Sequence, residues 1–318
     1  MPDMPGALVS IITPVFNGEP YLAEAIDSAL SQTYSNFELL IVNDGSSDNS
    51  RQIIEPYLRD PRIHYFEKTN GGVASARNYA LRHAQGKYIA FLDQDDKWLA
   101  NKLALQVEYL EGHKDAALHY AKQQVIDTDG HAFSFDWPTG VTGSCLREIF
   151  QRNQITILTT LVRKSVINEV GFFNEALSGT DDYEMWMRIL LKHPIHFDNT
   201  ILAEYRLHDT NVSLDSFKMT IRDLETITTF LSSHPEAKPI IGPAAIRARL
   251  FELNTQLAGW YAWKNKDFKQ ARSHYLVSIR QKPLYIRAYI RWLYYILTDT
   301  QRQKLSWYHS KINRWFHK

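Results

Sequence analysis

Short apolar runs alternate with amphipathic segments along residues 7–92, and this alternation constrains the fold more than any other feature. Runs such as 37–42 (FELLIV) have the length and branched apolar composition of strands that are covered on both faces. Strands that alternate with helices predict a mainly parallel sheet with helices on both of its faces. The expected strands are residues 7–13, 37–42, 62–66 and 87–92; the expected helices are 22–30, a short or kinked one around Pro56, and 73–84.

The pattern changes further along the chain. Residues 116–163 are expected to be mixed strand and short helix, and a helix over 181–191 and a strand over 201–206 follow. Beyond residue 215 the strand patterns stop and the sequence has helical spacing. We therefore predict an α/β body over residues 1–215 and an all-α extension over 216–318.

The two parts differ in charge, although the whole chain has 36 Lys and Arg against 35 Asp and Glu. From Trp260 onward 13 basic residues stand against two acidic ones, a net charge of +11, which leaves −10 for residues 1–259. An acidic body is a poor general binder of nucleic acid, so no nucleic acid partner is expected. A basic tail with interleaved aromatic and aliphatic residues suits an anionic membrane surface. A helical extension with a solvated basic face fits the same residues equally well.

The sequence supports neither a membrane span nor secretion. The 318 residues contain no run of about 18 uninterrupted apolar residues. Residues 1–8 (MPDMPGAL) lack the basic start and apolar centre of a secretion signal. Cys145 is the single cysteine and has no partner for an internal disulfide, which fits a reducing compartment. These features predict a cytoplasmic protein.

An acid cluster follows the strand expected over 87–92. Asp93 and Asp95 stand at the carboxyl end of that strand, where open α/β sheets bind ligands. Crowded carboxylates repel one another unless a cation intervenes, and Mg²⁺ or Mn²⁺ holding a diphosphate would relieve the repulsion. The alternative is a capping cluster for a helix that begins near Lys97. Residues 127–129 (DTD) repeat the pattern, but Gly130 follows and the setting is typical of a hairpin turn.

Two other loops are expected at the same sheet edge. Asp44, after the second strand, is either a turn residue before Gly45 or an acceptor for the imide N–H of a pyrimidine base. Pro14 is expected to end the first strand, and Asn17 and Gly18 form the turn after it. A dinucleotide fold would carry three glycines there, so this loop favours contact with a base or ribose instead of a nicotinamide cofactor.

Charged residues elsewhere add further candidates. Arg77 lies just inside a helix and could neutralise a diphosphate or hold a nucleotide, or it could form a surface ion pair with Glu67 or another nearby acid. Asp181 and Asp182 open another helix, where they either stabilise the helix dipole or supply a general base. His208, near the end of the body, is either structural or a ligand.

Taken together and in order, these motifs resemble family 2 of the inverting glycosyltransferases, which have the GT-A fold, a Rossmann-like mixed sheet. The resemblance extends over residues 9–213. Members of that family transfer a sugar from a nucleotide diphosphate donor, usually a UDP-sugar, to an acceptor hydroxyl. The motifs are IITPVFNGEPYL, LLIVNDGSSDNS, NGGVASARN, YIAFLDQDD, TDDYEMWMRI and YRLHDTNVS.

The resemblance implies a nucleotide site. Pro14 and Asn17 match the loop beside the nucleotide, and Asp44 matches the acid that binds the base. Arg77 matches an arginine near the nucleotide, and Asp93 matches the ribose-side acid of the Asp-x-Asp motif.

The resemblance also implies a catalytic and a metal site. Asp95 matches the metal ligand of the motif, and His208 matches a group near the metal or the diphosphate. Asp182 matches the catalytic base of what is commonly a Glu-Asp pair; because the first acid here is Asp181, either of the two could point inward. Mg²⁺ or Mn²⁺ is the implied cofactor.

The implied function is metal-dependent, inverting sugar transfer to a glycan or lipid-linked acceptor in bacterial surface polysaccharide synthesis. The Gln-x-x-Arg-Trp motif of processive members is absent, which implies addition of one or a few sugars. The basic extension would then contact the inner membrane face or form a homo-oligomer. The alternatives are a sugar-phosphate nucleotidyltransferase and a catalytically silent nucleotide-sugar-binding or scaffolding protein.

Overall fold

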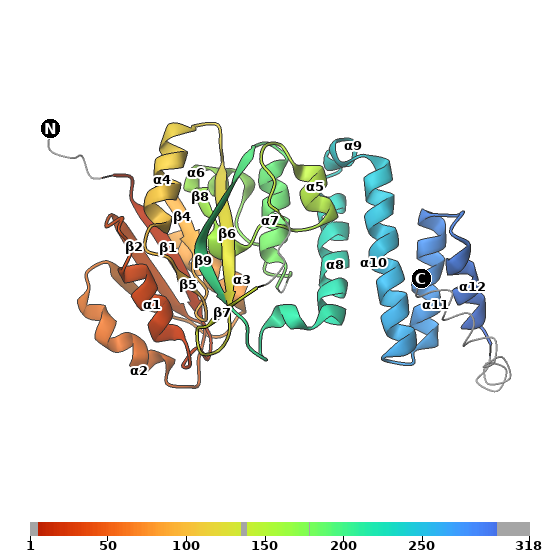
Figure 1. The fold of residues 1–318 in the computed structure, drawn as a ribbon, viewed down its shortest axis with the longest axis horizontal. Helices are drawn as coiled ribbons and strands as arrows, with labels where there is room; N and C mark the ends of the chain where they lie inside the picture. Colours follow the sequence, from red (N-terminus) through yellow and green to blue (C-terminus); the bar gives the residue numbers. More distant parts are fainter. Residues whose placement is uncertain (1–5, 135–138, 178, 298–318) are drawn as a thin grey trace. The chain divides into compact units, whose positions relative to one another are not determined.

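The computed structural model describes residues 6–134, 139–177 and 179–297, which form two compact units (Figure 1). The first unit contains the residues up to Leu214 together with Thr226–Ile240. The second contains Asp215–Glu225 and the residues from Ile241 onward. Helix α8 (Ser216–Ser233) contributes to both units, so a division of the chain at residue 215 stays a proposal.

The first unit is built on a nine-stranded mixed sheet with the strand order β3-β2-β1-β4-β8-β6-β9-β5, and β7 pairs with β6. The four strands from β3 to β4 are parallel, as the alternating sequence pattern predicts. β8 is antiparallel to both of its neighbours, whereas β6 and β9 are parallel. The strands are β1 Val9–Val15, β2 Phe37–Asn43, β3 Ile63–Glu67, β4 Tyr88–Phe91, β5 Lys97–Trp98, β6 Leu118–Ile126, β7 Ala132–Phe133, β8 Leu161–Arg163 and β9 Ile195–Arg206.

Helices connect the strands and cover the sheet. Pro56 divides the second helical segment, because α2 ends before it and a 3-10 turn (η1) contains it. The helices of the first part of the chain are α1 Leu22–Leu30, α2 Ser50–Ile54, η1 Glu55–Arg59, α3 Val73–His83, α4 Lys102–Gly112, α5 Leu146–Gln151, η2 Ile157–Thr159, α6 Lys164–Val170, α7 Asp181–Leu190 and η3 Val212–Leu214.

Three sequence predictions are wrong in their bounds. β1 continues through Pro14 to Val15. Proline has no backbone N–H to donate to a neighbouring strand, but β4 already ends opposite Ile12, so no hydrogen bond between these strands is lost at Pro14. The helix expected near Lys97 begins at Lys102, and the residues between include the short strand β5. β9 begins at residue 195, because pairing with β6 extends it through a polar stretch of low strand propensity.

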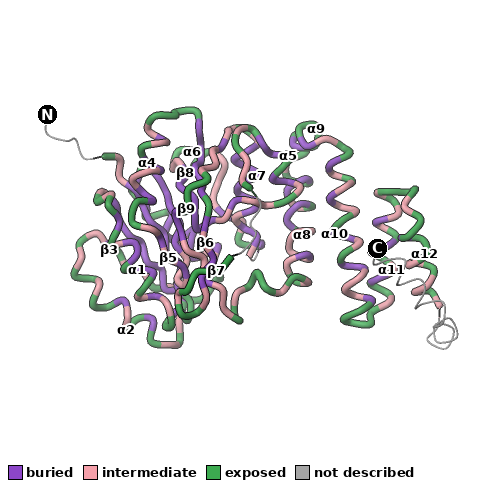
Figure 2. The backbone as a smooth tube through the Cα atoms, in the orientation of Figure 1, coloured by how far each residue is buried: buried purple, intermediate pink, exposed green. Residues whose placement is uncertain are grey.

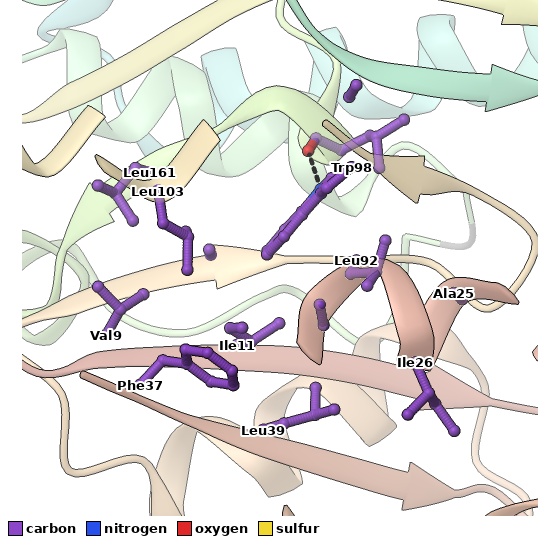
Figure 3. Close-up of a cluster of buried hydrophobic side chains, with 14 of the residues drawn as sticks. Val9, Ile11, Ala25, Ile26, Phe37, Leu39, Leu92, Trp98, Leu103 and Leu161 are labelled. Carbon is purple, nitrogen blue, oxygen red and sulfur yellow. Dashed lines mark hydrogen bonds between the residues drawn. The ribbon is translucent and has the colours of Figure 1, made fainter. Parts of the chain in front are cut away.

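The core of the first unit lies between the sheet and its helices. Figure 3 shows side chains of β1 and β2, such as Ile11 and Leu39, packed beside Ile26 of α1. The Trp98 indole closes one end of this core and donates a hydrogen bond to the Leu158 carbonyl at 2.9 Å. Strands β1, β2 and β4 are buried along their whole length, and β6 and β8 along most of theirs (Figure 2), so the centre of the sheet is a rigid support for the loops at its edge.

The second unit is helical. Ala258, Tyr275 and Ala288 form its small buried cluster, and Asp267 caps α11 by accepting a hydrogen bond from the Gln270 N–H. Among the described residues, none of the helices combines the length and the apolar character needed to cross a bilayer. The helices from α9 onward are α9 Ala237–Ile241, α10 Pro243–Trp263, α11 Phe268–Gln281 and α12 Ile286–Tyr294.

Candidate active site

The loops after β1, β2 and β4 meet at the carboxyl edge of the parallel strands. The Gln94 side chain joins two of them, because its amide accepts from the Phe16 N–H at 2.8 Å and donates to the Phe16 carbonyl at 3.0 Å. Asn17 joins the loop after β1 to the loop after β2: its N–H donates to the Ser46 hydroxyl, and its side-chain oxygen accepts from the Ser47 N–H. Asn17 adopts a left-handed backbone conformation with φ of 51°. These contacts hold the Pro14–Asn17 segment against the loop after β2.

Asp44 is buried and orders the loop between β3 and α3. Its carboxylate accepts hydrogen bonds from the Lys68 ammonium at 2.6 Å, the Gly71 N–H at 3.0 Å and the Gly72 N–H at 2.8 Å. The turn after β2 is held instead by Asn43, whose side chain accepts from the Ser46 N–H, so the interpretation of Asp44 as the turn residue is wrong. A carboxylate offers about four lone-pair positions, so Asp44 retains little capacity for a further donor.

Arg77 lies at the centre of a buried ion-pair cluster. Its guanidinium contacts Asp93 of the β4 loop at 2.8 Å and Asp181 of α7 at 3.0 Å, and only 5% of the residue is exposed. The predicted alternative is a surface pair with Glu67 or another nearby acid. Glu67 pairs with Arg51 instead, and Arg77 does pair with the nearby Asp93, but the guanidinium is buried and does not lie at the surface. Arg77 therefore ties Asp93 in the loop after β4 to the acidic start of α7.

The charges of this cluster do not balance. Burial opposes the charge on Arg77, but Asp93 and Asp181 outweigh that effect and raise its pKa above the ordinary value. Burial raises the pKa of Asp93, and Arg77 only partly opposes the shift. With Asp182 included, three carboxylates surround one guanidinium. The site therefore favours protonation of a carboxyl group or the arrival of a further cation.

The two acids that open α7 have different surroundings. Asp181 is 1% exposed and bound to Arg77, whereas Asp182 is only partly buried and accepts a hydrogen bond from the Tyr183 N–H. Burial and the neighbouring Asp181 raise the pKa of Asp182 to about 7, although Arg77 opposes the shift. A partly exposed carboxylate that titrates near neutral pH is suited to accept a proton from a hydroxyl.

Asp95 and His208 form a second polar pair. The Asp95 carboxylate lies 2.9 Å from the His208 ring nitrogen Nε2, and both side chains are partly exposed. On the other side of the ring, Nδ1 lies 2.8 Å from the Thr210 hydroxyl, which fixes the ring orientation. The next acid, Asp96, is buried; it accepts from the Arg206 N–H, and burial next to Asp95 raises its pKa well above the ordinary value.

The Asp95–His208 pair fits a divalent cation. A carboxylate oxygen and an imidazole nitrogen aimed at each other are a donor set that suits Mn²⁺, whereas Mg²⁺ prefers oxygen ligands throughout. A further cluster of potential ligands, Asp127, Asp129 and His131, has its ligand atoms within 4.8 Å of one another. It lies in the turn between β6 and β7, where Asp127 accepts the N–H groups of residues 129 and 131, so the predicted hairpin turn is confirmed.

Sequence reasoning missed two positioning residues. Arg206 is buried and reaches the Asp95 carbonyl at 3.0 Å, and its guanidinium also contacts the Glu24 carboxylate at 2.8 Å. It therefore holds the acid cluster against α1 and the end of β9. Lys68 could not be found from the sequence, because nothing in the local sequence connects it with Asp44. Arg206 had a signal, since it is a cation two residues before the candidate His208.

The mixed sheet, with its parallel part and its acidic carboxyl edge, has the architecture of the GT-A fold. The solved structure of Staphylococcus aureus TarS residues 1–349 in complex with UDP-GlcNAc has a TM-score of 0.58 at 18% identity, covering 87% of this chain and 92% of that one. The mannosyltransferase PcManGT from Pyrobaculum calidifontis, solved with GDP-Man and Mn²⁺, has a TM-score of 0.58 at 16% identity, covering 86% and 76%. The predicted GT-A fold is confirmed.

A family model described as glycosyl transferase family 2 matches residues 10–170. An Escherichia coli relative, the UDP-Glc:alpha-D-GlcNAc-diphosphoundecaprenol beta-1,3-glucosyltransferase WfgD, is 33% identical over 230 residues, which are 71% of this chain and 87% of that protein. The chain belongs to glycosyltransferase family 2, and the predicted enzyme class is confirmed.

An uncharacterized glycosyltransferase of Rickettsia felis is 41% identical over 207 residues, 63% of this chain. The match spans only 34% of that protein, so the chain corresponds to about a third of it.

Proposed function

We propose that this chain is a metal-dependent, inverting and non-processive glycosyltransferase that moves a sugar from a UDP-sugar to the hydroxyl of a glycan or lipid-linked acceptor. The observation that carries the proposal is the Arg77 cluster. Through Asp93 and Asp181 it connects the Asp-x-Asp loop after β4 with the start of α7. The donor side of the site and its candidate base are thereby brought to one place.

Asp182 is the proposed general base. Arg77 occupies Asp181 through an ion pair, which leaves Asp182 as the more exposed of the two acids. Its carboxylate would remove the proton from the acceptor hydroxyl as that oxygen attacks the sugar from the side opposite the leaving diphosphate. Attack from the opposite side inverts the configuration at the sugar carbon.

Asp95 and His208 are the proposed residues that hold Mn²⁺ or Mg²⁺. When bound, such an ion supplies positive charge to the departing diphosphate. The relative PcManGT was solved with Mn²⁺, which supports this assignment. Asp93 and Arg77 would position the ribose and diphosphate, while Pro14, Asn17 and Asp44 would lie beside the base.

The choice of UDP follows from the named relatives. WfgD is named for UDP-Glc and TarS was solved with UDP-GlcNAc, whereas PcManGT was solved with GDP-Man. A thermal-shift panel of UDP, GDP, UDP-Glc and UDP-GlcNAc, each with and without Mn²⁺, tests the choice. We expect the uridine compounds to raise the melting temperature only with the metal. If GDP stabilises the protein and the uridine compounds do not, or if none of the nucleotides stabilises it, the proposed donor is wrong.

We also propose that the chain acts at the cytoplasmic face of the membrane and contacts the bilayer through α12. Ile286, Ile290 and Leu293 recur at helical spacing and are 69%, 41% and 55% exposed. The opposite side of the helix packs into the second unit through Ala288. An exposed apolar stripe in a part of the chain with strong net positive charge has the chemistry of an anionic membrane surface.

Vesicle flotation tests the membrane contact. The full chain should float with vesicles of phosphatidylglycerol and phosphatidylcholine, and less so as salt is raised. Replacement of Ile286, Ile290 and Leu293 by serine should abolish flotation. Leu58→Ser in the first unit, where Leu58 is 43% exposed, is the matched control and should float normally. If the full chain ignores anionic vesicles, the membrane contact is wrong; light scattering then tests α12 as an oligomer contact.

A further inference from the structure

A cavity lies in the first unit, between β6, β9 and the segment before η2. Its volume is about 50 Å³, enough for a few water molecules or for one hydroxyl-bearing edge of a sugar ring. Its lining includes Gln123 of β6, Phe197 and Asn199 of β9, and Gln154 and Thr156. None of these residues belongs to the acid clusters described above.

An irregularity in the sheet accompanies this cavity. β6 and β9 pair in register until Ala121, which lies opposite Asp198. The next two β6 residues then pair with Ile201 and Ala203, so β9 carries extra residues that have no partner on β6. Asn199 is one of them. Such bulges redirect side chains and are frequent beside functional sites.

Three buried amide atoms at the cavity have no hydrogen-bond partner among the described residues. Gln123 is only 5% exposed, and both its side-chain nitrogen and its oxygen are unpaired. The side-chain oxygen of Gln154 is also buried and unpaired. Leaving such groups unsatisfied destabilises a fold, so their persistence needs a polar occupant that both donates and accepts hydrogen bonds.

The chemistry of the lining selects the occupant. A sugar hydroxyl both donates and accepts, as an amide does, and the Phe197 ring offers an apolar surface for the C–H face of a sugar. Lys122 is the one charged residue of the lining, and its side chain is exposed. The lining holds no carboxylate and no buried cation, which disfavours a metal ion or a phosphate.

We propose that this cavity is a subsite for a neutral sugar of the acceptor glycan. The proposal deepens the proposed function and rests on it. Gln123 precedes Ile126 by three residues, and Ile126 pairs with Arg206, whose N–H donates to Asp96. At about 3.3 Å per residue, Gln123 lies about 10 Å along the strand from the catalytic edge. One acceptor chain can therefore place its reacting hydroxyl at that edge and another sugar in the cavity.

Gln123→Leu removes the amide without removing volume. Because an unpaired buried amide is replaced by an apolar group, the variant should melt at the same temperature as the unchanged protein or higher. Gln124→Leu is the matched control, since the Gln124 amide already donates to backbone carbonyls and does not line the cavity. Both variants should bind UDP with Mn²⁺ as the unchanged protein does.

The probes are glucose, mannose and N-acetylglucosamine, with inorganic phosphate as the negative control. We expect at least one sugar, and not phosphate, to shift the Gln123 side-chain amide signal in a ¹H–¹⁵N spectrum, assigned by its loss in Gln123→Leu. Sugar affinity should fall about tenfold in Gln123→Leu and remain unchanged in Gln124→Leu, the loss expected for one or two hydrogen bonds.

Two outcomes separate the subsite from the catalytic proposal. If UDP binds but no sugar moves the amide signal, or if Gln123→Leu binds sugar normally, the cavity holds water only and the subsite is wrong. If a sugar binds there while no nucleotide binds at all, the subsite stands and the assignment of a nucleotide-sugar donor fails.

Discussion

Two Asp-x-Asp triplets in this chain share a sequence pattern but differ in their surroundings. Asp93 and Asp95 follow the buried strand β4, where Arg77 and His208 contact them. Asp127 and Asp129 lie in the turn between β6 and β7. Burial raises the pKa of Asp93, whereas the N–H of His131 lowers the pKa of Asp127.

The difference teaches that the position of acids within the fold matters more than their spacing. In the turn, backbone N–H groups satisfy the Asp127 carboxylate, so its charge has a structural explanation. At the sheet edge, Asp93 shares one guanidinium with Asp181 and Asp182, so negative charge remains in excess. An excess of buried negative charge is a condition under which a cation or a proton is bound.

The largest expected effect is a loss of kcat when an acid of α7 is replaced, compared with the same substitution in the turn between β6 and β7. Asp182→Asn should lower kcat by about 10² to 10⁴, the usual contribution of a general base, while UDP still binds with Mn²⁺. Asp129→Asn, the same substitution in the turn, should leave kcat within about twofold, since no proton transfer is assigned to it. Steady-state rates with a UDP-sugar measure both. If Asp182→Asn keeps full activity, either Asp181 is the base or the assignment of a general base at the start of α7 is wrong.

Removal of the Arg77 guanidinium should destabilise the cluster at the sheet edge. Arg77→Met leaves the buried Asp181 and the partly exposed Asp93 without their partner, and loss of one member of a buried pair such as Arg77–Asp181 costs about 3–5 kcal/mol of unfolding free energy. Arg51→Met, whose pair with Glu67 is largely exposed, should cost less than about 1 kcal/mol. Urea denaturation measures both. Equal costs would show that the Arg77 cluster contributes no more than a surface pair.

The two Asp-x-Asp triplets can be compared directly by their effect on Mn²⁺-dependent UDP binding. Asp95→Asn should weaken Mn²⁺-dependent UDP binding by about 10- to 100-fold or more, because a proposed ligand is lost. Asp127→Asn should leave it unchanged, although Asp127 belongs to a cluster with ligand-like spacing. Calorimetric titration of UDP at fixed Mn²⁺ decides the matter. A larger loss in Asp127→Asn would reverse our assignment of the metal site.

The pH dependence should show the smallest effect. A pKa of about 7 for Asp182 means that kcat/KM falls about tenfold per pH unit below that value, as the base becomes protonated. The folded-state pKa exceeds the ordinary value of 3.8, so the stabilising contribution is fully present below about pH 4 and is lost as the pH rises through 7. Asp182→Asn should therefore gain stability relative to the unchanged protein as the pH rises from 4 to 7. Parallel curves for the two proteins would contradict the raised pKa.

Much of the sheet edge that carries Asp44 and Asp93 could be predicted because it depends on local sequence. The run at 37–42 has the composition of a buried strand, so Asp44 had to follow it at the sheet edge. The partner of Arg77 could not be predicted, since Asp181 lies 104 residues away and only the packing of α7 brings it near. The contacts of Lys68 with Asp44 and of Arg206 with the Asp95 carbonyl also join segments that are distant in the sequence.

The sequence by itself determined the alternating strands and helices, the acids that follow them and the basic character of the C-terminal part. These features depend on periodicity and composition, which act over a few residues. Only the tertiary structure decided that Arg77 is buried between Asp93 and Asp181, that Asp182 is the more exposed acid, and that β9 bulges beside Gln123. Such choices arise from contacts between distant segments, where burial and neighbouring charge, not residue type, set the chemistry of a side chain.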